Sequence, residues 1–195
     1  LEQALAGAEG PAFYSLYWPL IDTLSHFHGP HHGDSPSSAC LEEMEFIDLM
    51  LGKVADICSR YGCTLAVVAD HGQTALRPEA AHSVQGDLKA SLNRPPGGGR
   101  RALYLSGVDV DRVSADAALA GSLQLAISTD DAIADGWFGG SCDGLSSRIG
   151  DTIVLAGEGV QFLYDYGRGT YAHYGCHAGL TSREMHVPLL VVPHV

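Results

Sequence analysis

The stretch Thr64-Leu65-Ala66-Val67-Val68-Ala69-Asp70-His71-Gly72 joins a short apolar run to an abrupt polar end. Before it, the apolar residues of the segment 37–62 recur at spacings of three and four, which predicts a helix. Ser37 or Ser38 can cap the start of this helix, and Gly62 ends it. A β-branched run directly after a helix is typical of a buried parallel strand. This unit therefore predicts an α/β fold, with the polar tripeptide at the carboxyl end of a strand.

The rest of the sequence continues the alternation of strands and helices. Hydrophobic strands separated by helices predict a layered, mostly parallel sheet with helices on both faces. We expect a helix tail at 1–6, strands at 12–18, 101–106, 123–128 and 187–192, a loop at 22–36, a polar surface excursion at 78–99, a helix at 113–120, and an antiparallel hairpin of 152–156 with 160–164.

Size and charge limit the classes of function. With 195 residues, 46% of them hydrophobic and 17% charged, the chain fits one domain with a sizeable core rather than a disordered acidic chain. The formal net charge of -12 argues against a nucleic-acid polymer or an anionic membrane as partner, because lysine and arginine would have to supply the attraction. No apolar run reaches the roughly 18 residues that a membrane helix needs. An acidic chain that handles an anionic substrate needs local positive charge, which bound metal cations supply.

The cysteines and the first residues bear on the compartment. The five cysteines are odd in number and form no C-x-x-C pair, which favours a reducing compartment such as the cytoplasm over a disulfide framework. The segment Leu1 to Ala6 has the composition of a helix entered halfway, and the chain does not begin with Met. We therefore expect a preceding portion that the sequence does not contain, and the compartment stays open.

Three groups of potential metal ligands follow predicted strands or lie in glycine-rich loops, where α/β sheets bind ligands. Asp22 and His26 are four residues apart and can meet one cation if the chain makes a helical turn. Asp70 and His71 end a hydrophobic strand, where burying two ionisable groups is costly unless they are paired or metal-bound. His177 lies between glycines on a loop. These five oxygen and nitrogen ligands, without a thiolate, suit a catalytic zinc pair.

Each group also has a plainer interpretation. Asp22 and Asp70 can cap a turn or a helix beside ordinary histidines. His177 can be structural or exposed, and the nearby His173 is an alternative ligand. The histidines at 28, 31 and 32 are expected to be exposed, unless one of them lines a substrate pocket. The recurrence of Asp–His pairs at strand ends favours the metal site.

The order of these motifs resembles that of the type I phosphodiesterase / nucleotide pyrophosphatase family, in the alkaline phosphatase superfamily. The shared order is D-x-x-x-H followed by Gly29-Pro30, then D-H-G after a hydrophobic strand, then a G-x-H loop that leads into E-M-x-V-P-L-L at 184–190. The resemblance spans Tyr17 to Val192. It implies a three-layer α/β/α sandwich without its N-terminal part, so that residues 1–195 form a single partial catalytic domain with a surface insertion around 78–150.

The resemblance also implies roles for the ligands. Asp22, His26 and His177 would hold one divalent cation, and Asp70 with His71 would help to hold another. Both cations would be zinc, with manganese as the alternative. The substrate would be a small phosphodiester or nucleotide, and the Thr or Ser nucleophile would lie upstream, with a further Asp.

Other activities and one consequence for the isolated chain follow from the same resemblance. Phosphomonoesterases, phosphonate hydrolases and phosphomutases of the superfamily share these ligands, and a non-catalytic zinc-binding fragment is the alternative of another class. The residues Ser25, Gln73 and Ala178 depart from the family pattern without removing a ligand. A sheet without its first strands would expose hydrophobic edges, so we expect the segment alone to be unstable or homo-oligomeric, and inactive.

Overall fold

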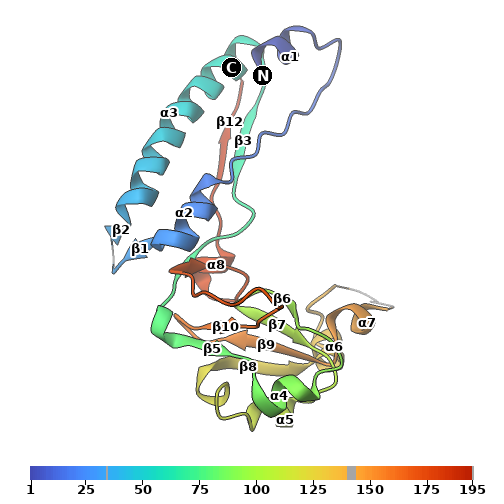
Figure 1. Ribbon diagram of the computed structural model, residues 1–195. Helices are drawn as coiled ribbons and strands as arrows, with labels where there is room; N and C mark the ends of the chain where they lie inside the picture. The colour runs from blue at the N-terminus through green and yellow to red at the C-terminus, as the bar shows by residue number, and fades with distance from the viewer. Residues whose placement is uncertain (34, 140–143, 195) are drawn as a thin grey trace.

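The computed structural model describes residues 1–33, 35–139 and 144–194 (Figure 1). Its α-helices are α1 (Glu2–Ala6), α2 (Leu20–His28), α3 (Ser38–Arg60), α4 (Gly86–Ser91), α5 (Val110–Ser114), α6 (Thr129–Ala134), α7 (Leu145–Ile149) and α8 (Ser182–Met185), with 3-10 turns at Pro78–Ala80 and Ala120–Ser122. Its strands are β1 (His31–His32), β2 (Ser35–Pro36), β3 (Leu65–Val68), β4 (Thr74–Ala75), β5 (Ala81–Ser83), β6 (Gly97–Gly98), β7 (Ala102–Leu105), β8 (Leu123–Ser128), β9 (Thr152–Ala156), β10 (Gln161–Leu163), β11 (Gly175–Cys176) and β12 (Leu189–Val192). The α/β class is thereby confirmed.

The chain divides into two parts that meet around α8 (Figure 1). The helical part consists of α1, α2, α3 and the two-stranded sheet β3–β12. The sheet part contains the four-stranded sheet β6-β7-β9-β8, with α4 to α7 around it. The short pair β4–β11 contacts helix α2 of the helical part, so residues far apart in the sequence come together at this junction.

The sheet part holds the hydrophobic core. Its largest cluster includes Leu105, Val113 and Val154, all fully buried. The polar stretch 78–99, expected on the surface, contributes to this cluster, because Leu88 on α4 is 1% exposed and β5 pairs with β10. The expectation of a surface excursion is therefore wrong for these side chains. The wider assignment of residues 1–195 to one domain with an insertion around 78–150 stays a prediction.

The expected antiparallel hairpin of β9 and β10 is also wrong. Both edges of β9 are occupied, by β7 on one side and β8 on the other, and each pairing is antiparallel. β10 pairs instead with β5, in the parallel sense. Among the described residues, β5 and β10 pair in parallel and the other strand pairs are antiparallel. The expected mostly parallel sheet is therefore not seen in this part of the fold.

The helix predicted from the opening stretch is confirmed as α3. Ser37 caps it, because its Oγ accepts a hydrogen bond from the backbone N–H of Cys40 at 3.4 Å. The following strand β3 is not buried and not parallel, contrary to expectation. It pairs antiparallel with β12, and Val68 and Leu189 are 64% and 68% exposed. β12 was expected to be buried as well, yet all four of its residues are exposed, because among the described residues its strand neighbour is β3 alone.

Two N-terminal segments differ from expectation: an expected strand is irregular, and part of an expected loop is helical. Residues 12–18, expected to be a strand, have no regular structure, and Phe13 is 92% exposed. The aromatic composition favours a strand, but no strand in the described part of the chain pairs with this segment. Its last residue, Trp18, instead packs on α3, where its ring lies 5.7 Å from that of Phe46. Conversely, the expected loop at 22–36 begins inside helix α2.

Two further sequence expectations concern cysteines and membranes. Cys40, Cys58, Cys63 and Cys176 are free thiols, and Cys142 lies outside the described residues. None of the described helices combines the length and apolarity needed to cross a membrane.

Candidate metal centre

Helix α2 places the first two candidate ligands on one face. Asp22 and His26 are four residues apart, which is about one helical turn, so their side chains lie one above the other. The Nε2 atom of His26 is 3.3 Å from Oδ1 of Asp22. Their side chains are 17% and 36% exposed, in the order His26 and Asp22, so the pair is partly shielded from water but still accessible.

A glycine allows α2 to approach the strand that carries the next ligand. A Cβ atom at Gly175 would overlap the carbonyl oxygen of Ser25 and crowd the ring of Pro30. With glycine there, the backbone N–H of Tyr174 donates to the carbonyl oxygen of His26 at 2.9 Å. The main chain thus fixes α2 to β11, and the first residue after β11 is His177.

His177 completes a group of three with the α2 pair. Its Nε2 atom lies 3.5 Å from Oδ1 of Asp22. One ligand atom each from Asp22, His26 and His177 lies within 4.8 Å of the others. Two imidazole nitrogens and one carboxylate oxygen are an ordinary protein donor set for zinc, which leaves further coordination positions open.

The protonation pattern of His26 fits metal binding. Its Nδ1 lies 2.8 Å from the carbonyl oxygen of Gly175, so Nδ1 carries the hydrogen and donates it. The Nε2 lone pair is then directed toward Asp22 and is available to a cation. For His177, burial and the neighbouring His71 lower the pKa of the imidazole, so the neutral form that binds metals is favoured.

The second pair lies directly against this group. Asp70 and His71 follow β3, and the ring of His71 stacks on that of His177 with centroids 3.6 Å apart and planes inclined by 10°. Nε2 of His71 is 3.6 Å from Oδ1 of Asp70. Within the described residues, no third His, Cys, Asp or Glu completes a metal-binding group with these two. The structure therefore brings all five predicted residues together, while their role as ligands stays a prediction.

Sequence reasoning missed Gln73 as a member of this cluster. Its Nε2 donates to Oδ1 of Asp22 at 2.5 Å, and its Oε1 is buried without a partner among the described residues. The signal available in the sequence was its position directly after Asp-His-Gly, on the loop that carries His71. Gln73 therefore orients the carboxylate that the two histidines share.

His173 lies behind His26 rather than in the group of three. The Nδ1 atoms of the two histidines are 3.1 Å apart, and Cys176 completes a second cluster of potential ligands with them. His173 faces Nδ1 of His26, which the Gly175 carbonyl already engages. Burial, followed by the charge of Arg100, lowers the pKa of His173 to about 4, so His173 is neutral at neutral pH. This geometry favours His177 over His173 as the ligand.

The remaining loop histidines were expected to be exposed. His28 and His32 are exposed, whereas His31 is half-buried and contacts the guanidinium of Arg183 on α8. His31 therefore lies near the junction where the candidate centre is built, but among the described residues it belongs to neither potential metal-binding group.

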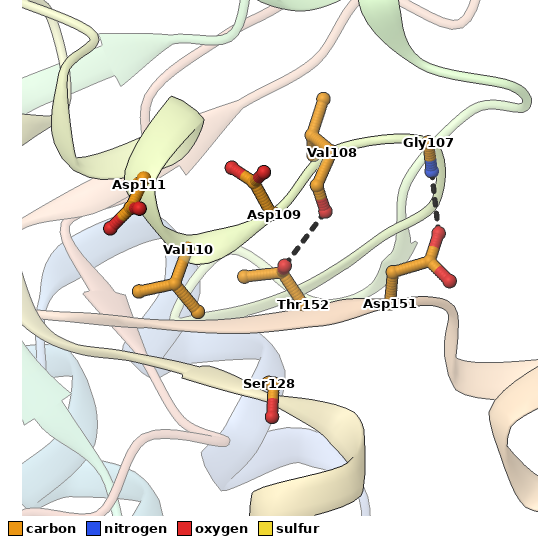
Figure 2. Close-up of a pocket in the computed structure, with 8 residues that line it drawn as sticks. All are labelled: Gly107, Val108, Asp109, Val110, Asp111, Ser128, Asp151 and Thr152. Atoms are coloured by element: carbon orange, nitrogen blue, oxygen red, sulfur yellow. Dashed lines mark hydrogen bonds between the residues drawn. The ribbon is translucent and has the colours of Figure 1, made fainter.

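A cavity in the sheet part lies away from the candidate centre and has a different lining. It has a volume of about 420 Å³ and is surrounded by carboxylates at the turn before α5 and at the start of β9 (Figure 2). Two of them are already engaged with the backbone: Asp151 accepts from the N–H of Gly107 at 2.6 Å, and Asp109 caps α5 through the N–H of Arg112 at 2.8 Å. None of the five candidate ligands lines this cavity.

Comparison with known proteins places this geometry in context. The sequence profile of the family "Type I phosphodiesterase / nucleotide pyrophosphatase" matches residues 1–180. No curated protein sequence matches the chain. Among solved structures, human ectonucleotide pyrophosphatase / phosphodiesterase 5 has a TM-score of 0.65 at 18% identity, covering 90% of this chain and 46% of that chain.

Two further structures share the fold. An inactive variant of the murine ectonucleotide pyrophosphatase / phosphodiesterase 5, in complex with AMP, has a TM-score of 0.64 at 20% identity, covering 90% of this chain and 46% of that chain. Phosphonoacetate hydrolase from Sinorhizobium meliloti 1021, in complex with phosphonoformate, has a TM-score of 0.55 at 17% identity, covering 85% and 45%. The present chain therefore has an alkaline-phosphatase-like fold and spans about half the length of these neighbours.

Proposed function

Because this chain belongs to the type I phosphodiesterase / nucleotide pyrophosphatase family, we propose that it is the metal-binding part of an enzyme that hydrolyses phosphodiester or pyrophosphate bonds. The observation that carries the proposal is the convergence of Asp22, His26 and His177, with ligand atoms within 4.8 Å of one another. The stacking of His71 on His177 supports a second set of ligands beside the first. In-line phosphoryl displacement with two metal ions requires two adjacent sets of metal ligands.

The residues divide into two sets of ligands. Asp22, His26 and His177 hold one divalent cation, and Asp70 with His71 supply part of the coordination of another. Bound zinc, with manganese as the alternative, would stabilise charge on the entering and leaving oxygens and lower the pKa of a bound hydroxyl. In this acidic chain of net charge -12, such cations also offset the repulsion of an anionic substrate.

The protein supplies orientation and proton control. The Gly175 carbonyl holds the hydrogen of His26 on Nδ1, so that Nε2 faces the centre. Gln73 fixes the carboxylate of Asp22 through the hydrogen bond to Oδ1. Burial and the neighbouring His71 lower the pKa of His177, which favours the neutral imidazole that binds a cation without first losing a proton.

The nucleophile belongs to a segment that precedes this one, in this proposal. Support comes from the second pair of ligands, Asp70 and His71, which lacks a third partner in the described part of the chain. The coverage of only 46% of the neighbouring phosphodiesterase structures agrees with it. An upstream carboxylate and a Thr or Ser hydroxyl would complete the centre, and no Ser or Thr of this chain is assigned that role.

Two substrate classes compete. The phosphodiesterase neighbour in complex with AMP supports a nucleotide substrate, and this is the class we propose. The phosphonoacetate hydrolase neighbour supports cleavage of a phosphonate as the second candidate. Enzymes that hydrolyse phosphomonoesters or move a phosphoryl group within a substrate use the same types of metal ligand. The substrate test below therefore also has to distinguish these activities.

The test is a substrate panel assayed with the complete protein that carries this segment. Bis-(p-nitrophenyl) phosphate and a dinucleoside polyphosphate represent the proposed class, p-nitrophenyl phosphate the monoesters, and phosphonoacetate the phosphonates. His177→Ala should lower kcat/KM for the preferred substrate at least about 100-fold, because it removes a ligand of the centre. His28→Ala, at an exposed position on the same helix as His26, is the matched control and should leave kcat/KM unchanged.

Each outcome of the panel has a distinct meaning. Preference for the diester or pyrophosphate, abolished by a chelator and restored by zinc or manganese, supports the proposal. Preference for phosphonoacetate or the monoester would overturn the proposed substrate class but would leave the proposed metal centre in place. Absence of turnover with every substrate, by a protein that still binds zinc, would establish the non-catalytic scaffold instead.

A further inference from the structure

A buried ion pair joins the helix α8 to the sheet part. Arg101, directly before β7, and Glu184, on α8, are 83 residues apart in the sequence and are 0% and 2% exposed. The guanidinium donates from Nε to Oε1 and from Nη2 to Oε2, at 2.9 Å each. Its Nη1 donates to the carbonyl oxygens of Gly157 and Val160 at 2.5 and 2.6 Å. The carboxylate is therefore anchored to the core through a fully buried cation.

The same carboxylate accepts hydrogen bonds from the loop that carries His177. Its Oε1 accepts the backbone N–H of Gly179 at 2.8 Å, and Oε2 accepts the hydroxyl of Thr181 at 2.7 Å. A Cβ atom at Gly179 would lie 2.7 Å from both carboxylate oxygens, so glycine is needed for this approach. Between His177 and Gly179, Ala178 has φ of 79°, a conformation that costs a residue with a side chain free energy and persists only where its surroundings enforce it.

The main chain of the same residue holds the other loop. The carbonyl oxygen of Glu184 accepts the backbone N–H of Gly72 at 2.8 Å, directly after His71. A Cβ atom at Gly72 would overlap the carbonyl oxygen of Arg183, so this contact also needs glycine. One residue of α8 thus touches both glycine-containing loops, and the imidazoles on those loops stack at 3.6 Å (for α8 at the junction, see Figure 1).

We propose that the Arg101–Glu184 pair is a positioning device for the metal centre, which sets the spacing of His177 and His71 by fixing both of their loops to the core. The inference rests on the proposed function, because it assigns the pair to that centre. Replacing a buried pair by apolar residues is often neutral for stability, so stability alone gives little reason to bury one here. Fixing the two loops that carry His71 and His177 gives a specific reason for the buried pair, since groups behind metal ligands commonly set metal affinity.

Cobalt binding tests the proposal without relying on turnover. The metal-free complete protein is titrated with Co²⁺, and the visible absorption gives both a dissociation constant and a signature of the coordination geometry. The variants are Glu184→Gln, which removes the negative charge that holds the loop, and Gly179→Ala. The second variant keeps both charges of the ion pair but places a methyl group against the carboxylate and the Arg101 guanidinium, which displaces the loop. Glu2→Gln is the matched control, because Glu2 also pairs with an arginine, Arg60 at 3.0 Å, but at an exposed position on the N-terminal helix.

The expected result is a dissociation constant for Co²⁺ raised about 10–100-fold in Glu184→Gln and Gly179→Ala, with an altered spectrum and no change in Glu2→Gln. Urea unfolding of each metal-free variant establishes that it is folded at the titration temperature. Should Glu184→Gln fail to fold, Gly179→Ala decides the matter. A folded Gly179→Ala that binds Co²⁺ with the wild-type constant and spectrum overturns the positioning role alone. A wild type that binds no Co²⁺ overturns the proposed centre itself, and the positioning role with it.

Discussion

One carboxylate oxygen, Oδ1 of Asp22, is the atom on which the candidate centre converges. It lies 3.3 Å from Nε2 of His26, 3.5 Å from Nε2 of His177 and 2.5 Å from Nε2 of Gln73. In the proposed centre the two histidines would offer lone pairs to a cation, whereas the amide of Gln73 fixes the direction of the carboxylate. The amide thus acts on the ligand and not on the substrate.

This arrangement predicts the effect of removing the amide. In Gln73→Leu the carboxylate of Asp22 loses its orienting hydrogen bond, so metal affinity should fall about 10-fold or more. Competition with a chromogenic chelator measures the affinity. Gln3→Leu, at an exposed position on α1, is the control. Equal affinity in Gln73→Leu and wild type would mean that the hydrogen bond has no role in the centre.

The carboxyl of Glu184 gives a prediction for pH. Burial alone would raise its pKa, but the hydrogen bonds from Arg101 and Thr181 outweigh burial and hold the pKa below the ordinary value of 4.5. A folded-state pKa below the unfolded one means that the unfolded chain binds more protons as the pH falls. The contribution of Glu184 to the free energy of unfolding is therefore complete above pH 4.5 and is lost as the pH falls through the lowered pKa.

The measurement compares wild type and Glu184→Gln by urea unfolding at several pH values. At pH 7 the variant should be less stable by about 3 kcal/mol, because it leaves the buried Arg101 without its charged partner. This difference should shrink as the pH falls below about 4.5. A difference that stays constant from pH 7 to pH 3 would contradict the assigned direction of the pKa.

Residue types and spacing predicted much of the candidate centre. The D-x-x-x-H spacing places Asp22 and His26 one turn apart, and helix α2 delivers that geometry. Convergence of these two with His177, 151 positions further along the chain than His26 by their numbers, depends on Gly175 and on the pairing of β4 with β11. Such long-range contacts have no local signal. The position of Gln73 directly after Asp-His-Gly was visible in the sequence, but its contact with Asp22 was not.

At the scale of elements, the capped helix α3 is where local sequence decides most. Ser37 is 2% exposed, accepts the N–H of Cys40 and donates its hydroxyl to the carbonyl oxygen of Gly29 at 2.6 Å. Gly29 is the residue directly after α2, so the same side chain begins α3 and closes the turn that follows Asp22 and His26. The hydroxyl thereby links the helix that carries two candidate ligands to the 23-residue helix α3.

Removing this hydroxyl should therefore weaken both helices. Ser37→Ala is expected to cost about 1–2 kcal/mol of unfolding free energy, through the lost cap and the lost hydrogen bond to the Gly29 carbonyl. Denaturant titration of the complete protein measures the loss. Ser59→Ala, at an exposed position in the last turn of the same helix, should change the stability by less than about 0.5 kcal/mol. Equal effects of the two variants would exclude a capping role for Ser37.

Elements with a periodic apolar pattern and with capping or turn residues at their ends were predicted well. The pairing of strands with one another was not. Helix α3 and strand β8 have their expected positions because the apolar period and the flanking breakers are local. The hairpin of β9 and β10 was wrong, since adjacency in sequence does not reveal that β9 lies between β7 and β8. The strand expected at 12–18 was wrong because a strand needs a hydrogen-bonding neighbour as well as suitable residues.

At the scale of the whole molecule, the helical part leaves much apolar surface uncovered. The four residues of β12 are 44–68% exposed, and Phe46 and Leu49 on α3 are 47% and 60% exposed. Each strand of the β3–β12 pair has one edge without a partner in the described part of the chain. The family resemblance predicted exposed strand edges, whereas the apolar composition of β3 and β12 predicted buried strands. In the structure, both strands have an open edge and exposed side chains.

This surface predicts the behaviour of the 195-residue segment in isolation. Contiguous apolar surface and open strand edges drive association, so the segment should elute as an oligomer or be degraded rapidly by protease. Leu189→Lys and Val191→Lys together should shift the elution toward the monomer. Size-exclusion chromatography with light scattering is the measurement, and a compact, protease-resistant wild-type monomer would refute the prediction.

Elemental analysis of the purified complete protein tests whether the five candidate residues bind metal. The wild type should contain about two zinc or manganese ions per chain. Asp22→Ala and His71→Ala should each lower this number, and His28→Ala should not. A wild type that retains no metal after reconstitution, or one whose metal content is the same in all three variants, would contradict the assignment of Asp22, His26, Asp70, His71 and His177 as ligands.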